Sequence, residues 1–530
     1  MGYSGGYDNH VVEPDCNYSN YFGERVIPCP RDLEDYARLW ISGVSNTLSD
    51  LPPGSTVTLS WAGYGSPPTI DLFQATDSDG GTGYLTNLII ASNQINNSLC
   101  RYVGRLGPCG SIQLNTSTYS NGWAGDHYIW CGVLSGIGQL NLTITDGKGN
   151  VLAQSPQFIQ IQDIKQMYER WTVGDNDDNK PLSRAAPMTN AVLVNDGQPT
   201  CQYPYYAPCD TNDTYILYVT GWNMATWLKD RWAETAYKRL YWQGYQGRFG
   251  LFRWPCYNLS ADTAGFDTSE WNSWKTGRPL ESFLAKLNGM YPSNVYVFAH
   301  SQGNPAMGEA MRLATNQIVN TYVATQAAVS ARAYDNTLAT NATGYYSLKT
   351  PDSQGNYYTT GASSYFSGSI GAGTYVNFYN PLDYALMGNS LNPLTFHPGW
   401  LEDQSLKPDS GYGYATPSSS IPFGYYQEGI ISELLINSSL PRNPLRFPTD
   451  TYQIFAMCAQ SYSLALGAQQ NVGVGGLPFT LNRQVNLNGD PFFFGGNHIQ
   501  HDEQFAFDNM TAAPYWRQLL QSFGLQTTPE

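Results

Sequence analysis

The stretch that decides the fold is Val295-Tyr296-Val297-Phe298-Ala299-His300-Ser301-Gln302-Gly303. Its first five residues form an apolar run, which predicts a buried strand over 294–299. Apolar residues then recur at the i, i+3, i+4 and i+7 spacing of one helical face, as Met307, Ala310, Met311 and Ala314. Ser301 therefore lies at a turn from a strand into a helix, with a small residue two places before it and two places after it.

This position suits a nucleophile. A serine at the tip of such a turn needs small neighbours, because the strand and helix backbones approach closely there. The turn holds the hydroxyl above the sheet edge, and the backbone N–H of Gln302 can stabilise an oxyanion at the start of the helix. An ordinary strand-to-helix turn is the alternative interpretation.

Length and composition indicate a folded chain of two domains. Its 530 residues exceed one ordinary core, and its aromatic content of 14% is higher than in disordered chains. The net charge of −15 argues against a nucleic-acid partner, because phosphate binding needs clustered Lys and Arg. No apolar run reaches the roughly 18 residues of a membrane span, so we expect no transmembrane segment.

The nine cysteines favour an oxidising compartment. Three close pairs lie in polar segments that suit local disulfides: Cys16 and Cys29, Cys100 and Cys109, and Cys201 and Cys209. Cys131, Cys256 and Cys458 are expected as buried thiols. We therefore expect a secreted, periplasmic or cell-surface protein whose signal peptide has been removed. No cysteine pair has C-x-x-C spacing, so neither a metal site nor a cofactor is predicted.

The N-terminal part reads as strands. Residues 1–35 lack periodicity and predict an extended arm, whereas 36–163 predict an antiparallel β-sandwich of the immunoglobulin-like type. The expected strands include 55–61, 69–73, 84–90, 111–114, 127–131 and 140–144. We interpret this domain as a structural or docking module. The alternative is a carbohydrate- or surface-binding module that uses the rings of Trp61, Tyr64, Trp123 and Trp130.

The C-terminal part, 191–530, alternates strands with helices. Residues 161–173 predict a short connecting helix, and with the polar segment 174–181 they form a connection that we place at 164–190. Beyond it the expected strands are 215–220, 249–254, 294–299, 319–326 and 374–379, and the expected helices include 225–242 and 280–290. This order predicts an α/β fold with a mostly parallel sheet flanked by helices. Two long intervals, near 335–372 and 388–450, predict cap-like insertions.

A serine hydroxyl is a poor nucleophile at neutral pH and needs an adjacent base. We favour His501, because the segment after it, 504–520, can form a helix that fixes its backbone. His498 in the same loop is the alternative. Asp383 follows the strand 374–379 and a proline-bearing turn, where its carboxylate can orient the imidazole.

These segments together resemble the α/β-hydrolase superfamily, and its lipase and esterase branch, over about residues 190–530. The superfamily motif G-x-S-x-G has Ala299 here in place of its first glycine, and Ser301, Asp383 and His501 follow its chain order. By this resemblance, the second oxyanion donor beside Gln302 is the backbone N–H of Trp222, with Asn223 as the alternative. Trp222, Asn223 and His300 are then expected to contact the substrate.

The resemblance implies an extracellular serine esterase, lipase or polyester hydrolase that acts on a small or polymeric ester through an acyl-enzyme. An acyltransferase or an amidase on the same fold is one alternative. A surface-binding or adhesion protein with an inactive hydrolase domain is another.

Overall fold

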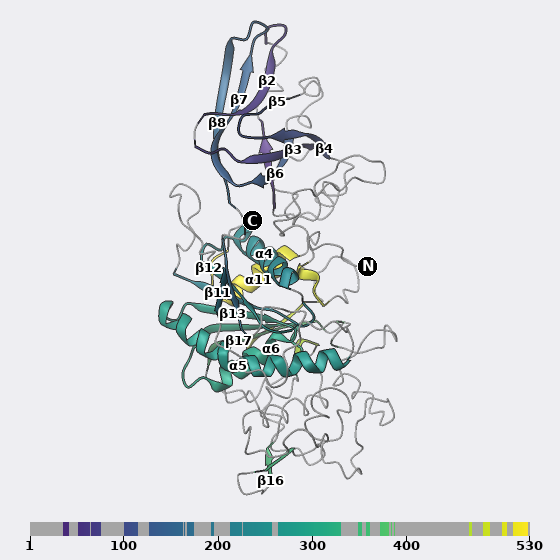
Figure 1. The fold of residues 1–530 in the computed structure, drawn as a ribbon, viewed down its shortest axis with the longest axis vertical. Helices are drawn as coiled ribbons and strands as arrows, with labels where there is room; N and C mark the ends of the chain where they lie inside the picture. The colour runs from purple at the N-terminus through teal and green to yellow at the C-terminus, as the bar shows by residue number, and fades with distance from the viewer. Residues whose placement is uncertain are drawn as a thin grey trace.

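A computed structural model describes residues 35–41, 51–63, 65–75, 100–114, 127–162, 164, 167–173, 192–195, 213–224, 226–256, 263–329, 348–351, 357–360, 371–380, 383, 386, 466–468, 481–487, 501–505 and 512–527. A β-rich region lies at one end of the long axis, and an α/β body lies beside it (Figure 1). Across these ranges no helix combines the length and hydropathy that a membrane span requires.

Two four-stranded antiparallel sheets make up the β-rich region, in the orders β1-β6-β3-β4 and β5-β2-β7-β8. The first sheet consists of β1 (Tyr36–Trp40), β3 (Thr69–Ala75), β4 (Cys100–Leu106) and β6 (His127–Leu134). The second consists of β2 (Thr56–Trp61), β5 (Ser111–Leu114), β7 (Gly136–Thr145) and β8 (Val151–Ile161).

Alternation along the strands builds one core between these two sheets. In β2, Val57 and Leu59 are buried and pack in the same cluster as Ile70 and Leu72 of β3. The expected strands in this region are present, except that 84–90 lies outside the described residues. Trp61 is buried and Trp130 packs against this core, so both rings are used in packing. Tyr64 and Trp123 lie outside the described residues.

One expected disulfide does not form. Cys109 is a free, exposed thiol in the turn after β4, whereas Cys100 begins that strand. A strand of seven residues is about 20 Å long, which far exceeds the roughly 7 Å that a disulfide allows between Cα atoms. Cys131 and Cys256 are buried thiols outside any disulfide, as expected. The other cysteine pairs and Cys458 lie outside the described residues.

The α/β body is built on an eight-stranded sheet of order β10-β9-β12-β11-β13-β14-β17-β18. In this spatial order the last seven strands, β9-β12-β11-β13-β14-β17-β18, run parallel to one another. The edge strand β10 pairs antiparallel with β9. Their bounds are β9 (Glu169–Thr172), β10 (Val192–Asn195), β11 (Tyr215–Val219), β12 (Arg248–Arg253), β13 (Val295–His300), β14 (Val319–Thr325), β17 (Ala372–Tyr379) and β18 (Leu481–Asn486). The predicted α/β class with a mostly parallel sheet is confirmed.

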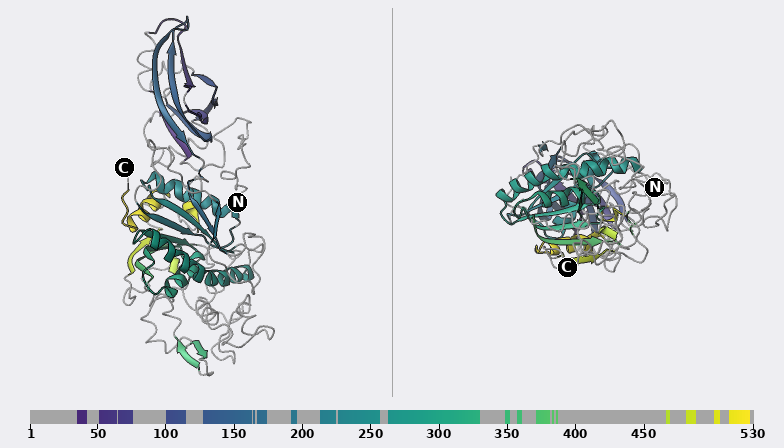
Figure 2. Two further views of the ribbon diagram at one scale, coloured as in Figure 1. Left: turned by 60° about the vertical axis from the view of Figure 1, so that its left-hand side comes forward. Right: turned by 90° about the horizontal axis from the view of Figure 1, so that it is seen from below.

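Helices cover both faces of this sheet (Figure 2). They are α4 (Thr226–Trp242), α5 (Thr263–Met290), α6 (Gly303–Leu313) and α11 (Ala512–Ser522). Leu217 and Val219 of β11 share a core with α5 and α6, whereas Ile216 and Tyr218 share the opposite core with α4 and α11. Because side chains alternate along a strand, a fully apolar strand buried on both faces is what such a double-layered sheet requires.

The helix expected over 161–173 is wrong at both ends. Strand β8 continues to Ile161, and Glu169–Thr172 forms β9, which pairs with β12. The charges that make this segment look like a surface helix are neutralised inside the fold. Glu169 accepts a hydrogen bond from the Tyr215 hydroxyl at 2.6 Å and pairs with Arg248, and Arg170 pairs with Asp230.

Helix α5 begins at Thr263, well before the expected 280–290, and it includes Pro279. Beyond the proline, its residues Leu280, Leu284 and Leu287 still pack in the core, which compensates for the helical hydrogen bond that proline removes. Of the expected insertions, only the hairpin of β15 (Leu348–Pro351) and β16 (Tyr357–Thr360) and the start of β17 are described. The arm 1–34 and the segment 174–190 lie outside the described residues.

Candidate active site

Ser301 directly follows β13 and has a φ of 52°, in the left-handed region that a residue with a side chain adopts only at a cost of about 1–3 kcal/mol. Helix α6 starts two residues later at Gly303, where a Cβ would lie 2.6 Å from the Thr220 carbonyl oxygen and 2.7 Å from that of Val219. A Cβ on Gly221 would lie 3.0 Å from the Cβ of Ser301. The close approach explains why small residues surround the serine.

Hydrogen bonds over-determine this turn. The Ser301 N–H donates to the Thr325 carbonyl at 3.2 Å, and the Ser301 carbonyl accepts from the backbone N–H groups of Asn304 and Ala328, both at 3.1 Å. The Asn304 side chain donates to the carbonyls of Ser301 at 2.8 Å and of Ala299 at 3.0 Å. These bonds hold the strained backbone in place. Ser301 itself is buried, with an exposed fraction of 7%.

Strained residues gather at one edge of the sheet. Asn223 follows β11 with a φ of 58°, and Gln326 follows β14 with a φ of 43°. These two strands flank β13. Each of the three neighbouring strands is therefore followed by a left-handed residue, with Ser301 in the middle. Such strain persists where surrounding structure enforces it, and it is common at functional sites.

Asp383 and His501 meet at the same edge. They follow the neighbouring strands β17 and β18, and His501 Nδ1 lies 2.7 Å from Asp383 Oδ2. The carboxylate is fully buried, and Gln326 Nε2 donates to the same oxygen at 2.9 Å. His498, the alternative to His501, lies outside the described residues. The expected pairing of Asp383 with His501 is thus present in space, although 118 residues separate the two.

Burial and charge act in opposite directions on the His501 ring, which is 13% exposed. Desolvation alone would lower the pKa of His501, but attraction and hydrogen bonding by Asp383, with a further contribution from Asp502, raise it. Burial also raises the pKa of the Asp502 carboxyl. The site therefore stabilises a protonated imidazole beside a buried carboxylate.

His300, which we expect to contact the substrate, packs against the ring of His501 with 4.7 Å between centroids. Its ring is 1% exposed, and its Nε2 lies 2.9 Å from the His501 carbonyl oxygen. Because a carbonyl only accepts, Nε2 carries the proton. Burial, and then repulsion from His501, hold the pKa of His300 well below its ordinary value, so the ring stays neutral. Among the described residues, Ser301 and His501 are linked through His300 and not by a hydrogen bond between their own side chains.

The loop after β11 contains both residues from which we expect the second oxyanion donor, Trp222 and Asn223. The N–H of Asn223 already donates to the Cys256 carbonyl at 2.8 Å, so Asn223 does not serve as the second donor. Trp222 is half-buried in the same loop, beside the close contact of Gly221 with Ser301. Trp254 Nε1 holds this loop by donating to the Thr220 carbonyl at 2.8 Å. Gln302, the other expected donor, is fully buried, and its carbonyl accepts from Ser273 Oγ at 2.5 Å.

Sequence reasoning did not identify Gln326. The signal that could have identified it is its position directly after β14, the neighbour of β13, because side chains at the carboxyl ends of parallel strands converge. No group of three His, Cys, Asp or Glu side chains that would suit a metal ion occurs in the described ranges.

No protein-family model matches the chain, and no curated protein matches it. Among solved structures, the chain is similar to the crystal structure of Aspergillus fumigatus lipase B, with 13% sequence identity and a TM-score of 0.19. The match covers 50% of this chain and 66% of the lipase chain. A TM-score this low supports no conclusion about this chain.

Proposed function

We propose that this protein is a serine hydrolase that cleaves carboxylic esters through an acyl-enzyme intermediate, on an α/β-hydrolase fold that spans about residues 191–530. One observation carries the proposal: the 2.7 Å hydrogen bond between His501 and the fully buried carboxylate of Asp383 lies at the edge of the sheet where the strained Ser301 follows β13. A nucleophile elbow, a histidine and a buried carboxylate at one sheet edge are the parts that acyl transfer requires.

In the proposed reaction, Ser301 Oγ attacks the ester carbonyl while His501 Nε2 takes its proton. The backbone N–H groups of Gln302 and Trp222 stabilise the resulting oxyanion. The C–O bond to the alcohol breaks, and His501 returns the proton to the leaving oxygen. Water, deprotonated by His501, then attacks the acyl-serine and releases the acid. Asp383 keeps the proton on Nδ1 of His501 and stabilises the imidazolium as it forms, in line with the raised pKa of that ring.

The β-rich region has a core of its own, separate from the cores on the two faces of the α/β sheet. This separation supports a proposed division of the chain into domains. An arm at 1–35 would precede an immunoglobulin-like sandwich at 36–163, which serves as a structural or docking module or contacts a surface or carbohydrate. Residues 164–190 would connect it to the hydrolase domain and its cap-like insertions near 335–372 and 388–450. Because β9 lies within 164–190, the sheet of the hydrolase domain includes part of that connection. We also propose a secreted, periplasmic or cell-surface location, from the spacing of the cysteine pairs Cys16 and Cys29, and Cys201 and Cys209.

The test is covalent labelling together with turnover. The protein is expected to hydrolyse short p-nitrophenyl esters, and a fluorophosphonate probe is expected to label Ser301, as peptide mapping will show. Ser301→Ala should lose both labelling and about 10⁴-fold or more of the activity, because members of a triad act as a unit. The control is Ser282→Ala, which changes an exposed serine of α5. Neither turnover nor labelling in the wild type would refute the proposal and leave the binding-protein alternative.

Ester hydrolysis is separated from the other acyl-transfer chemistries by substrate choice. An amidase would turn over the matching p-nitroanilide at a comparable kcat/KM. An acyltransferase would form a new ester in preference to the free acid when an alcohol is added. We expect ester cleavage to exceed both reactions.

A further inference from the structure

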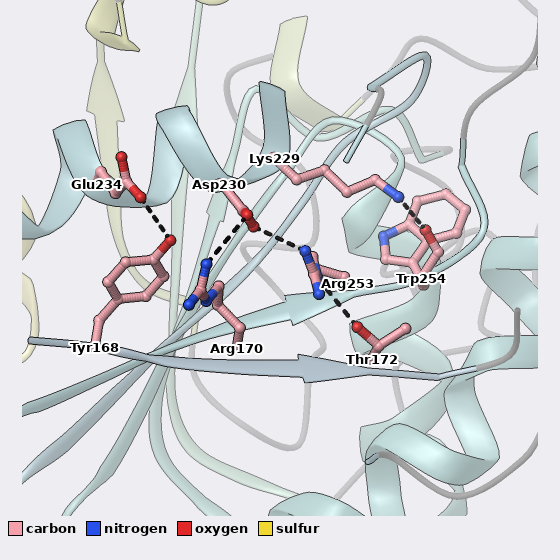
Figure 3. Close-up of polar contacts among 8 residues, drawn as sticks. All are labelled: Tyr168, Arg170, Thr172, Lys229, Asp230, Glu234, Arg253 and Trp254. Carbon is pink, nitrogen blue, oxygen red and sulfur yellow. Dashed lines mark hydrogen bonds and ion pairs between the residues drawn. The ribbon is translucent and has the colours of Figure 1, made fainter. Parts of the chain in front are cut away.

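Helix α4 carries charged side chains on a face that is turned toward the sheet (Figure 3). Lys229 Nζ donates to the Trp254 carbonyl at 2.8 Å, and Glu234 accepts from the Tyr168 hydroxyl at 2.9 Å. Both contacts are buried, so little solvent screens them.

Asp230 lies between these two contacts and bridges the neighbouring strands β9 and β12 (Figure 3). Its carboxylate pairs with Arg253 of β12 at 2.9 Å and with Arg170 of β9 at 3.5 Å. Arg253 also donates to the Thr172 hydroxyl at 3.0 Å (Figure 3). Helix α4 is therefore fixed in register against β9 and β12 by polar contacts over less than two of its turns.

The same helix holds the loop that carries His501. Arg239, which is 1% exposed, donates from Nη1 to the Gln504 carbonyl at 2.6 Å. About two helical turns earlier, the ring of Trp232 stacks on Phe505 with 4.5 Å between centroids and 6° between planes. The segment closes on itself through the Phe505 N–H, which donates to the Asp502 carbonyl at 2.9 Å.

The other end of this segment is held from β13. His300 Nε2 donates to the His501 carbonyl at 2.9 Å, so the residue that precedes the proposed nucleophile grips the backbone of the proposed base. Arg239 and His300 thus bind the fourth and the first carbonyl of the segment 501–505, and the fourth also accepts a longer hydrogen bond of 3.3 Å from Trp516 Nε1. Helix α4 is also connected to the loop after β11 through Trp254. Lys229 donates a hydrogen bond to the Trp254 carbonyl, and Trp254 Nε1 donates one to the Thr220 carbonyl.

We propose that Arg239 and His300 are positioning residues, which hold segment 501–505 so that His501 Nε2 faces the Ser301 hydroxyl while Nδ1 stays on Asp383. The inference rests on the proposed function, since it assigns to these two residues the placement of the proposed base. Its physical basis is the steep distance dependence of proton transfer: a misplacement of about 1 Å costs on the order of 10²-fold in rate. Neither side chain touches the reacting atoms.

Four variants test the proposal, with one matched control. Arg239→Met keeps the aliphatic volume and removes the donor, whereas Arg239→Lys keeps a donor. His300→Leu removes the other donor, whereas His300→Gln keeps an N–H that can reach the carbonyl. Lys238→Met is the control, because it removes a neighbouring α4 charge that pairs with Asp35, directly before β1, at 2.8 Å.

We expect Arg239→Met and His300→Leu to lower kcat by about 10- to 100-fold with little change in KM, since substrate binding does not depend on the base. Arg239→Lys and His300→Gln should recover most of kcat, and Lys238→Met should keep it. A second readout does not need activity. The downfield proton NMR signal of the His501 Nδ1–H bonded to Asp383 should broaden or vanish in the two donor-less variants and persist in Lys238→Met.

The outcomes separate the two proposals. If the folded donor-less variants keep both kcat and the NMR signal, or if Lys238→Met falls as far as Arg239→Met, the positioning role is refuted. If Arg239→Met does not fold, the His300→Leu and His300→Gln pair decides by the same readouts. A wild type that neither turns over esters nor labels at Ser301 refutes the proposed function, and the NMR signal then still reports whether the two donors place His501.

Discussion

Gly303→Ala tests the close contact between the first residue of α6 and the backbone at the end of β11. The added Cβ would lie 2.6 Å from the Thr220 carbonyl oxygen and 2.7 Å from that of Val219. Since Cβ atoms essentially never approach closer than 3.0 Å, α6 and the end of β11 must separate by about 0.4 Å or more. Both oxygens belong to backbone, so no side chain can rotate to relieve the clash.

Overpacking of this kind costs about 1–3 kcal/mol of stability. Each kcal/mol lowers the Tm by roughly 2–4 °C in a domain of 150–250 residues, and by roughly 2 °C or less in a longer domain such as this one. The displacement also separates the N–H of Gln302, at the start of α6, from that of Trp222, in the loop after β11. We therefore expect kcat for a p-nitrophenyl ester to fall by roughly 10-fold or more, because the two donors must converge on one oxygen.

Gly289→Ala is the matched control. Gly289 also lies in a helix, but its Cβ would meet nothing within 4 Å. This substitution should raise stability by about 0.5–1 kcal/mol through the helix propensity of alanine and leave kcat unchanged. Thermal unfolding followed by circular dichroism and steady-state kinetics measure both quantities. If Gly303→Ala is as stable and as active as Gly289→Ala, the conclusion that α6 packs too closely on the end of β11 for a side chain at position 303 is refuted.

Two further predictions concern the proposed base and its carboxylate. His501→Ala should reduce ester hydrolysis to the level of Ser301→Ala, whereas His498→Ala should keep a substantial fraction; the reverse result would place the base one helical turn earlier in the loop. Asp383→Asn should lower kcat by about 10⁴-fold, because the amide favours the wrong tautomer of His501. Since Asp383 raises the pKa of His501 against the effect of burial, its removal lowers that pKa. The acidic limb of kcat/KM should then move to lower pH; a limb that stays in place would mean that Asp383 does not set the charge of the base.

The strands and helices that the sequence predicts best are those whose own residues show the period of the element. Strand β11 and the elbow strand β13 are apolar runs buried on both faces, and the face of α6 repeats at helical spacing, so local pattern and tertiary burial agree. The same holds for the turn at Ser301, because its geometry depends on small neighbours within two residues. The chain order of Ser301 and Asp383 was also open to prediction, since each follows a segment with strand character. Strand β18, which precedes His501, was not predicted, and His501 was chosen because of the helix-forming segment after it.

Tertiary structure alone decided the rest, because the partners come from distant parts of the chain. Strand β9 looks like a polar connection until Tyr215, Arg248 and Asp230 arrive to satisfy its charges. His300 is only the neighbour of a serine in the sequence, and its hydrogen bond to a carbonyl 201 residues away turns it into a support for His501. Arg239 reads as a surface charge on an amphipathic helix, yet it is buried against a carbonyl 265 residues away. A period within one segment reveals which face is buried, but not which distant group will satisfy a buried charge there.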